Sequence, residues 1–453
     1  MVWLQSFCLR SLRCLLFKRI APSRFRASSS RENDHCFILH VRAIRGLLTL
    51  APSLAVTASA ADWPQFLGPN RNGTYPEANL AASWPKDGPK QVWQRRVGQG
   101  FSGPVVADGK LILFHRLGDE EVITCLDTKG GKDLWQFKYP ATYEDDFGHD
   151  PGPRATPCLD GDKVFTFGAD GMLHCLDLTA GQKLWSVDTK SEFGARKGFF
   201  GLACSPFVEG DRVFLNIGGL NGTGITAFDK STGKLVWKAT DHEAGYSSPI
   251  ATTIDGQRQV LFFTRSGLAA ADPQTGRIHW EFPWRARMHA SVNAATPLVN
   301  GNEVFLSESY GTGAVLLSVK NAKPAKVWSS DDALSNHYAT SVYREGFLYG
   351  YHGRQDVGRP ELRCVEWKTG KVRWSEDNFG GGTVTLAGNH LVLLHEDGRL
   401  LLAEASPQKF KLLQQAQILS AGVRAHPALA DGFLFARGKD RLACFDLRAR
   451  GGN

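Results

Sequence analysis

The nonapeptide DKSTGKLVW, at Asp229–Trp237, joins an acidic residue, a Thr-Gly turn and a tryptophan, and close variants of it recur along the chain. The variants are DTKGGKDLW (Asp127–Trp135), DLTAGQKLW (Asp177–Trp185), DPQTGRIHW (Asp272–Trp280) and EWKTGKVRW (Glu366–Trp374). Neighbouring copies begin about 40 to 50 residues apart, or twice that distance in one case, and self-similarity at this period is typical of propellers and other repeat proteins.

Each turn motif closes a longer unit in which the order of elements is constant. A small polar residue and usually proline precede an apolar strand, a glycine turn, two further strands and a last strand bearing tryptophan. Eight openings fit this template: SGPVVADGKLIL at Ser102, ATPCLDGDKVFTF at Ala155, CSPFVEGDRVFLN at Cys204, SSPIATTIDGQRQVLFF at Ser247, ATPLVNGNEVFLS at Ala295, ATSVYREGFLYG at Ala339, GTVTLAGNHLVLL at Gly382 and AHPALADGFLFAR at Ala425. Four short strands per unit predict an all-β, eight-bladed β-propeller with antiparallel blades.

Closure of the ring gives an independent check on this count. The eighth unit ends at RLACFDLR (Arg441–Arg448) after only three strands, whereas QVWQRRVG (Gln91–Gly98) is a strand without a unit of its own. Blade eight is therefore predicted to combine both, which leaves no unpaired edge in the ring. The predicted organisation is a leader at 1–60, whose first 40 residues are an extended leader or lie before the true start, a strap at 61–90, the propeller at 91–448 and a tail at 449–453.

A glycine four residues before tryptophan recurs in five units, for example at Gly233 and Trp237. A flat indole can stack on a neighbouring glycine because no Cβ intrudes there. The predicted docking series is Trp93, Trp135, Trp185, Trp237, Trp280, Trp328 and Trp374, with Leu412 or Leu413 substituting in blade seven. This spacing resembles the tryptophan docking motif of the quinoprotein-type propeller repeat family, over about residues 91–448.

The resemblance implies different functions, which the residues alone do not separate. One is a non-catalytic binding or scaffold module for an envelope protein or a small ligand, similar to the repeat component of the outer-membrane protein assembly machinery. Another is a periplasmic alcohol or sugar dehydrogenase with pyrroloquinoline quinone and calcium, held by a carboxylate and an amide. The third is a carbohydrate-binding or hydrolytic propeller that uses the region of Asp150, Arg154, Glu308 and Tyr310. No cofactor is assigned by a motif.

Charge and composition exclude one class of partner. The chain has a formal net charge of +8, but residues 1–60 hold nine basic and two acidic residues, which leaves 44 basic and 43 acidic residues in the rest. No basic surface for nucleic acid is therefore predicted. Arg42 and Arg45, the apolar run 46–57 and the Ala58-Ser59-Ala60 site form a secretory signal, which is too short to span a membrane. We expect a periplasmic or secreted monomer without a membrane span.

The cysteines are expected to be structural. Cys125, Cys175, Cys364 and Cys444 occupy one repeat position and read as small buried apolar residues. Cys158 and Cys204 lie at the other end of their repeats, and a disulfide between them is the alternative that export allows.

Residues that break the repeat are the candidates for function, because axis-lining side chains come from the loops that enter the innermost strands. One unusual polar or aromatic residue per blade, converging on one channel, would form a ligand site. The alternative is a solvated tunnel that binds only water. The candidates are Asp150, Arg154, Tyr246, Arg265, Asn293, Glu308, Tyr310, His337, Tyr338, His352 and His426, with His289 beside Asn293.

Other motifs carry little weight. GQGFSG (Gly98–Gly103) satisfies G-x-G-x-x-G, but a dinucleotide loop must open a helix and here Pro104 and a strand follow. The histidines lack metal-ligand spacing, so no metal site is predicted. No catalytic residue is assigned.

Overall fold

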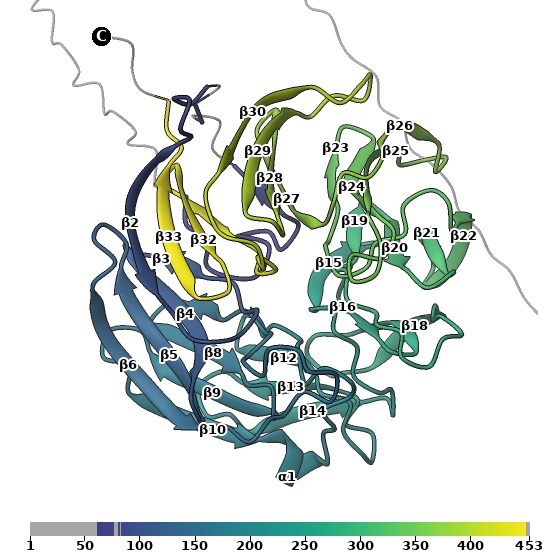
Figure 1. Cartoon of the computed structure of the whole chain (residues 1–453). Helices are drawn as coiled ribbons and strands as arrows, with labels where there is room; N and C mark the ends of the chain where they lie inside the picture. Colours follow the sequence, from purple (N-terminus) through teal and green to yellow (C-terminus); the bar gives the residue numbers. More distant parts are fainter. Residues whose placement is uncertain (1–60, 77–79, 82, 450–453) are drawn as a thin grey trace, which may run out of the picture. The chain divides into compact units, whose positions relative to one another are not determined.

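The computed structural model describes residues 61–76, 80–81 and 83–449, all within a compact unit that spans Ala58–Asn453. The predicted leader, residues 1–60, lies outside the described residues. Within the unit, eight blades of four antiparallel strands form a ring (Figure 1), and the sheet of one blade has a fifth, parallel strand from the N-terminal segment. The predicted fold class, an all-β eight-bladed propeller, is confirmed.

Inner strands contact the inner strands of neighbouring blades. From the inner to the outer strand, blades one to four are β3 (Val105–Ala107), β4 (Lys110–Leu117), β5 (Glu120–Asp127) and β6 (Asp133–Pro140); β7 (Cys158–Asp160), β8 (Lys163–Phe167), β9 (Met172–Asp177) and β10 (Lys183–Asp188); β11 (Phe207–Glu209), β12 (Arg212–Asn216), β13 (Ile225–Asp229) and β14 (Leu235–Ala239); and β15 (Ile250–Ile254), β16 (Gln257–Thr264), β17 (Gly267–Ala271) and β18 (Ile278–Pro283).

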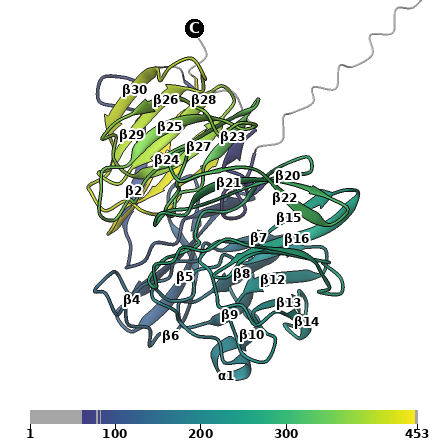
Figure 2. The ribbon, with the colours of Figure 1, turned by 90° about the vertical axis from the view of Figure 1, so that its right-hand side faces the viewer.

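Blades five to eight follow the same order. They are β19 (Leu298–Asn300), β20 (Glu303–Glu308), β21 (Gly313–Lys320) and β22 (Lys323–Ser330); β23 (Val342–Arg344), β24 (Phe347–His352), β25 (Glu361–Glu366) and β26 (Val372–Glu376); β27 (Gly382–Ala387), β28 (His390–His395), β29 (Arg399–Glu404) and β30 (Leu412–Gln417); and β31 (Ala428–Ala430), β32 (Phe433–Arg437), β33 (Arg441–Asp446) and β2 (Lys90–Arg96). The short helix α1 (Thr189–Phe193) lies at the periphery beside β10 (Figure 2).

Blade eight joins the two ends of the ring, as predicted. β2 pairs antiparallel with β33, and Trp93 lies opposite Cys444. On β32, the guanidinium of Arg437 is fully buried and donates to the carbonyls of Ser102 (2.9 Å), Phe114 (3.0 Å) and Gly98 (2.8 Å). Blade eight is therefore tied to blade one by one side chain as well as by packing.

The turn motif shows why these residues recur. Asp229 ends β13, and its Oδ1 accepts hydrogen bonds from the N–H groups of Ser231 (3.1 Å) and Thr232 (2.8 Å). Gly233 follows with a φ of 73°, in the left-handed region that favours glycine. A Cβ on Gly233 would lie 2.6 Å from the Trp185 ring of the preceding blade. The same turn therefore reverses the chain and receives an indole.

The predicted docking tryptophans lie on or next to the outermost strands. In six of them the indole Nε1 donates to a carbonyl in the turn region of the next blade at 2.7–3.1 Å: Trp93, Trp135, Trp185, Trp237, Trp328 and Trp374. Trp280 instead donates to Gln259 Oε1 of its own blade at 2.8 Å. The turn that would receive it, Asn321–Ala322 in blade five, has no glycine.

In blade seven the structure differs from the predicted series of docking residues. The register pairs Ala403 with Leu412 and then, after a bulge, Leu402 with Gln414. In the other blades tryptophan pairs with the residue equivalent to Leu402, so Gln414 holds that position and the assignment to Leu412 or Leu413 is wrong. The other blades have the same bulge, but the turn of blade seven is longer: Glu404 N–H donates to the Lys411 carbonyl, seven residues on, whereas Asp229 N–H donates to the Lys234 carbonyl, five residues on.

The N-terminal strap crosses the inner strands of several blades. Trp63 exchanges backbone hydrogen bonds with Val106 at 2.9 Å in blade one, and the Pro64 carbonyl accepts from Leu159 N–H (2.8 Å) in blade two. β1 (Thr74–Tyr75) then adds in parallel to β27 of blade seven. The strap therefore runs from blade one to blade seven along the inner ends of the sheets.

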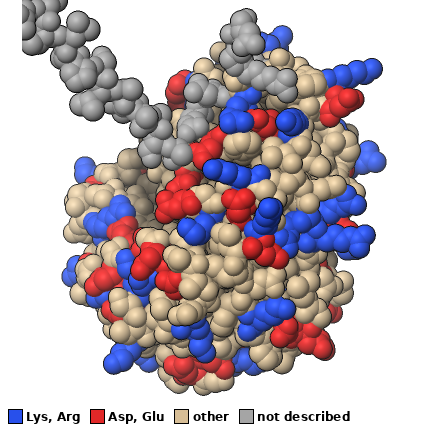
Figure 3. Space-filling view, turned by 90° about the vertical axis from the view of Figure 1, so that its left-hand side faces the viewer, with Lys and Arg blue, Asp and Glu red and all other residues tan. Residues whose placement is uncertain are grey.

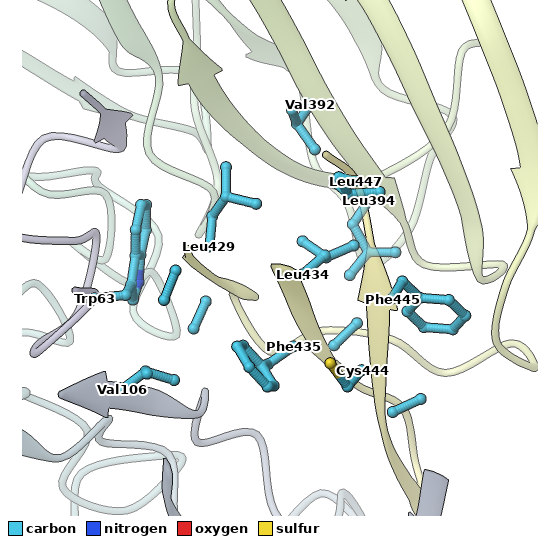
Figure 4. Close-up of a cluster of buried hydrophobic side chains, with 14 of the residues drawn as sticks. Trp63, Val106, Val392, Leu394, Leu429, Leu434, Phe435, Cys444, Phe445 and Leu447 are labelled. Atoms are coloured by element: carbon cyan, nitrogen blue, oxygen red, sulfur yellow. The ribbon is translucent and has the colours of Figure 1, made fainter. Parts of the chain in front are cut away.

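Trp63 is the apolar anchor of the strap. Its ring is 1% exposed and lies beside Val106 and Leu429 (Figure 4), in the cluster that also holds Phe435 and Phe445 of blade eight. The ring also stacks on His426, with centroids 5.8 Å apart and planes 13° apart. This cluster joins the strap to the seam between blades seven, eight and one.

Arg71 is the polar anchor of the strap. Its guanidinium is buried and donates to the carbonyls of Pro249 (2.9 Å), Pro206 (3.1 Å) and Ser205 (3.2 Å), and to Gln65 Oε1 (3.0 Å). Burial lowers the pKa of Arg71 to about 10, which leaves it charged at neutral pH.

The six cysteines in the described part of the chain are all buried and free. The repeat-position cysteines are therefore the small core residues predicted. The alternative disulfide between Cys158 and Cys204 is wrong, because each thiol packs separately: Cys204 Sγ accepts from Asn216 N–H at 3.4 Å, and Cys158 Sγ lies 3.9 Å from Gln65 Oε1. Burial raises the pKa of both thiols to about 11.

Two features bear on the surface. Among the residues in the structure, no helix is long and apolar enough to cross a membrane. On the face shown in Figure 3, acidic and basic side chains are interspersed, without a large area of one sign. That distribution matches the near-zero charge predicted for the chain after residue 60.

Candidate axial ligand site

A cavity of about 230 Å³ lies on the axis of the ring. Seven blades contribute to its wall from the loop that precedes the inner strand, and blade seven contributes Thr383 from β27 itself. Strap residues Phe66 and Leu67 line it as well. Because the strap crosses the inner strands, it covers one end of the axial channel. Aromatic and aliphatic side chains make up most of the wall.

Hydroxyl groups around the axis link neighbouring blades along part of the ring, a feature that sequence reasoning missed. The residue before the inner strand of one blade donates its N–H to the hydroxyl at the same position in the next blade, in four steps: Gly103 to Thr156 (3.1 Å), Thr156 to Ser205 (2.9 Å), Ser205 to Ser248 (3.0 Å) and Thr296 to Thr340 (2.9 Å). The signal for it was the Ser or Thr at the second position of six of the eight repeat openings.

The structure brings six of the eleven candidates to the cavity wall: Arg154, Tyr246, Tyr310, His337, Tyr338 and His426. They come from five blades around the axis, namely blades two, four, five, six and eight, so side chains from different sides of the ring converge on one cavity. The other five candidates do not line the cavity, and the role of all eleven stays a prediction.

Asp150 and His352 serve local structure. Asp150 Oδ1 accepts from Gly152 N–H (2.8 Å), and its charge supports the protonated form of buried Arg437. His352 Nδ1 accepts from Ser335 N–H (3.1 Å), where it orders the loop before blade six.

Arg265, Asn293 and Glu308 lie behind the wall and hold the loop 284–293. Arg265 donates to the carbonyls of Ser291 (3.3 Å) and His289. Asn293 Nδ2 donates to the carbonyls of Thr264 (2.8 Å) and Trp284 (3.1 Å). These residues therefore position the wall and do not form it.

Arg154 reaches the cavity but is already paired. Its guanidinium lies 2.8 Å from the buried carboxylate of Asp145, 3.3 Å from Tyr143 Oη, and 4.6 Å from the centre of the Tyr143 ring. The Asp145 carboxylate also accepts two backbone N–H groups, which together with these contacts lowers its pKa against the opposing effect of burial. Arg154 is thus a fixed part of the wall.

Arg424 is the cation that sequence reasoning missed. Its guanidinium lies 5.5 Å from the centre of the Phe101 ring and 6.0 Å from that of Tyr338. Within the part of the chain that the structure describes, it has no hydrogen bond or ion pair. The nearby Glu396 carboxyl accepts from the Tyr338 hydroxyl, and the charge of Arg424 acts on it without an ion pair between the two. The available signal was its position in VRAHP, immediately before the opening of blade eight.

Tyr310 and His337 form an ordered polar pair on the same wall. Tyr310 Oη lies 2.6 Å from His337 Nε2, and Gln355 N–H donates to His337 Nδ1 at 3.3 Å. Nδ1 is therefore the acceptor and Nε2 carries the ring hydrogen, so Tyr310 keeps its own hydroxyl hydrogen for a ligand. Burial lowers the pKa of His337 to about 4, which keeps the ring neutral at pH 7.

The cavity's donor set does not fit a calcium-bound quinone. Calcium takes about six to eight oxygen ligands, several of them carboxylates. Among the described lining residues Asp356 is the one carboxylate, and it is paired with Arg354 at 2.6 Å. No group of three or more His, Cys, Asp or Glu residues suited to a metal ion occurs in the described chain. Arg154 and Arg424 add positive charge, which would repel the ion.

Glu308 predicts a pH dependence of stability. Its carboxyl is fully buried, Oε2 accepts from Ala286 N–H (2.9 Å), and burial raises its pKa from 4.5 to about 7. The folded state then binds more protons than the unfolded state between these values, so this contribution to stability falls as the pH rises through that window. We expect the parent to lose stability relative to Glu308→Gln from about pH 5 to about pH 8, as measured by urea denaturation.

The control for this experiment is Glu120→Gln, which changes an exposed carboxyl on β5. Its difference from the parent should stay constant over the same range. A constant difference for Glu308→Gln as well would show that Glu308 does not titrate there.

Comparison with known proteins places the chain among propellers of two kinds. Residues 118–376, more than half of the chain, match the family model described as outer membrane protein assembly factor BamB. A quinoprotein ethanol dehydrogenase of Pseudomonas aeruginosa is 24% identical over 317 residues, which cover 59% of this chain and 48% of that protein. An outer membrane protein assembly factor BamB of Burkholderia pseudomallei is 28% identical over 177 residues, 37% of this chain and 40% of that protein.

The chain spans about half or less of the length of the curated relatives it matches. Among solved structures, BamB from Moraxella catarrhalis superimposes with a TM-score of 0.58 at 18% identity, over 80% of this chain and 99% of that one. Quinohemoprotein alcohol dehydrogenase from Comamonas testosteroni gives 0.58 at 14% identity, over 86% and 81%. At these identities the likeness shows the fold alone.

Proposed function

Because the chain belongs to the family described as outer membrane protein assembly factor BamB, we propose that it is a binding propeller whose axial cavity receives an anionic group on an apolar body. The predicted resemblance to quinoprotein-type repeats and to the assembly propeller is confirmed by the family match and the relatives. The ligand belongs to an envelope protein or is a small molecule, and the site of action is the periplasm or the cell exterior. The family description and the predicted secretory signal support that location.

Arg424 is the observation that carries this proposal. A guanidinium in a largely apolar cavity, with no hydrogen bond or ion pair to any residue that the structure describes, attracts a carboxylate or phosphate, because both accept paired N–H donors. The aromatic rings around it supply contact area for the rest of the ligand. Tyr310 adds one hydroxyl donor to the same wall.

Binding is tested with 4-phenylbutyrate and its amide, by calorimetry on the purified chain. We expect the acid to bind and the amide to bind more weakly. Arg424→Gln should weaken binding of the acid by about 10- to 100-fold, since a hydrogen bond to a charged group contributes about 1.5–3 kcal/mol. Arg373→Gln, which changes an exposed arginine on β26, is the control and should leave the affinity unchanged. Equal binding of acid and amide would contradict the proposed role of Arg424.

A quinone-dependent alcohol dehydrogenase is the second candidate, supported by the likeness to a quinoprotein ethanol dehydrogenase. The single paired carboxylate of the cavity counts against it. Incubation with pyrroloquinoline quinone and Ca²⁺, followed by absorbance and dye-linked alcohol oxidation, separates the two. Cofactor uptake with turnover would favour the dehydrogenase. Against the hydrolytic hypothesis, the described lining of the cavity offers no pair of carboxylates, since Asp150 and Glu308 do not line it.

A further inference from the structure

An aromatic rim continues outward from the axial cavity. Phe200 lines the cavity, and its ring centre lies 5.2 Å from that of Phe147 and 6.3 Å from that of Phe199. Phe147 is 53% exposed, although it is a large apolar residue. We call Phe147, Phe199 and Phe200 the aromatic rim. The described part of the chain leaves this apolar surface partly exposed.

The rim is held in place before any ligand arrives. Tyr246 Oη accepts from the N–H groups of both Phe199 (2.9 Å) and Phe200 (3.1 Å). The guanidinium of Arg265 lies 4.9 Å from the centre of the Phe199 ring on its other side. A surface fixed in this way loses little conformational entropy on binding, which favours a specific contact.

The cavity itself is small for an independent ligand. Sites for drug-sized molecules measure about 300–1,000 Å³, whereas this one measures about 230 Å³. A single apolar residue with its carboxylate on Arg424 suits that space. A ligand of that size would leave the aromatic rim uncovered, so the ligand that uses both features must extend outward from the cavity.

We infer that the axial site captures the C-terminus of another polypeptide, with the terminal carboxylate on Arg424, the last apolar side chain in the cavity and the preceding residues on the aromatic rim. Capture of a terminal carboxylate is an established way for proteins to recognise peptides. Charge complementarity favours it, because Arg424 has no partner among the described residues. This inference rests on the proposed function of the cavity and names its ligand.

The experiment compares three probes by fluorescence anisotropy or competition: a labelled hexapeptide that ends in leucine with a free carboxylate, the same peptide with a C-terminal amide, and N-acetylleucine. We expect the acid peptide to bind at least about 10-fold more tightly than the amide and than N-acetylleucine. Arg424→Gln should remove the preference for the acid over the amide.

Phe147→Ser tests the rim separately from the cavity. It should weaken the peptide and leave N-acetylleucine unchanged, whereas Leu134→Ala, an equally exposed apolar residue on β6, should change neither. If N-acetylleucine binds as tightly as the peptide, or Phe147→Ser has no effect, the peptide inference is wrong and the small-ligand function stands. If no carboxylate probe binds, including 4-phenylbutyrate, both proposals are wrong.

Discussion

Replacement of Arg437 by alanine should lower the free energy of unfolding by roughly 3–5 kcal/mol. The guanidinium satisfies the carbonyls of Ser102, Phe114 and Gly98 across the seam between blades eight and one. Each buried carbonyl left without a donor costs about 1–3 kcal/mol, and the lost side chain also leaves a cavity. Guanidinium denaturation followed by tryptophan fluorescence measures the change.

Arg441→Ala is the matched control for that experiment. Arg441 lies on the adjacent strand β33, is exposed, and donates only to Gln94 Oε1 at 3.1 Å. Its loss should stay within about 0.5 kcal/mol. Equal effects of the two variants would show that the seam does not depend on the buried guanidinium.

Arg71→Ala should detach the strap and lower stability by roughly 2–4 kcal/mol, because three backbone carbonyls lose a charged donor. The eight blades keep their own strand pairing in this variant, so the loss of structure should be confined to the strap and the residues it contacts. Hydrogen exchange should increase in residues 61–76 and at the Ser205 amide while the outer strands stay protected. Phe66 and Leu67 line the cavity, so binding of carboxylate probes should weaken as well.

Lys86→Ala changes an exposed cation in the same N-terminal segment and should leave the exchange pattern unchanged. If Arg71→Ala raises exchange throughout the ring, the strap is part of the folding unit. The description of Arg71 as a local anchor would then be wrong.

The architecture was predictable because the turn chemistry is local. An acidic side chain that accepts two N–H groups, followed by a left-handed glycine, can be recognised from a few residues, and five copies establish the period. Closure by β2 followed from counting strands. The tryptophan position of blade seven was not predictable, because its turn is two residues longer than that of blade three and the pairing across the sheet, not the spacing in the sequence, places Gln414 there.

The candidate site was predictable only in part. Departures from the repeat located the loops that meet on the axis, and Tyr310 and His337 came from that reasoning. The departures from the repeat did not reveal which polar side chains already have hydrogen-bond or ion-pair partners within the fold. Arg154 has Asp145 beside it, whereas Arg424 has no such partner, and this difference depends on loop geometry rather than on residue type.

Because blade eight combines both ends of the chain, it is the last blade that can be completed during folding. β2 can form its sheet only with β33, some 350 residues later in the sequence, and contacts of high sequence separation form slowly. Seven blades are therefore complete while Lys90–Arg96 still presents an open edge, a template for pairing with another copy. A chain released before Asp446 emerges cannot cover that edge, so partial synthesis or late translocation of the last strand should favour aggregation over a smaller propeller.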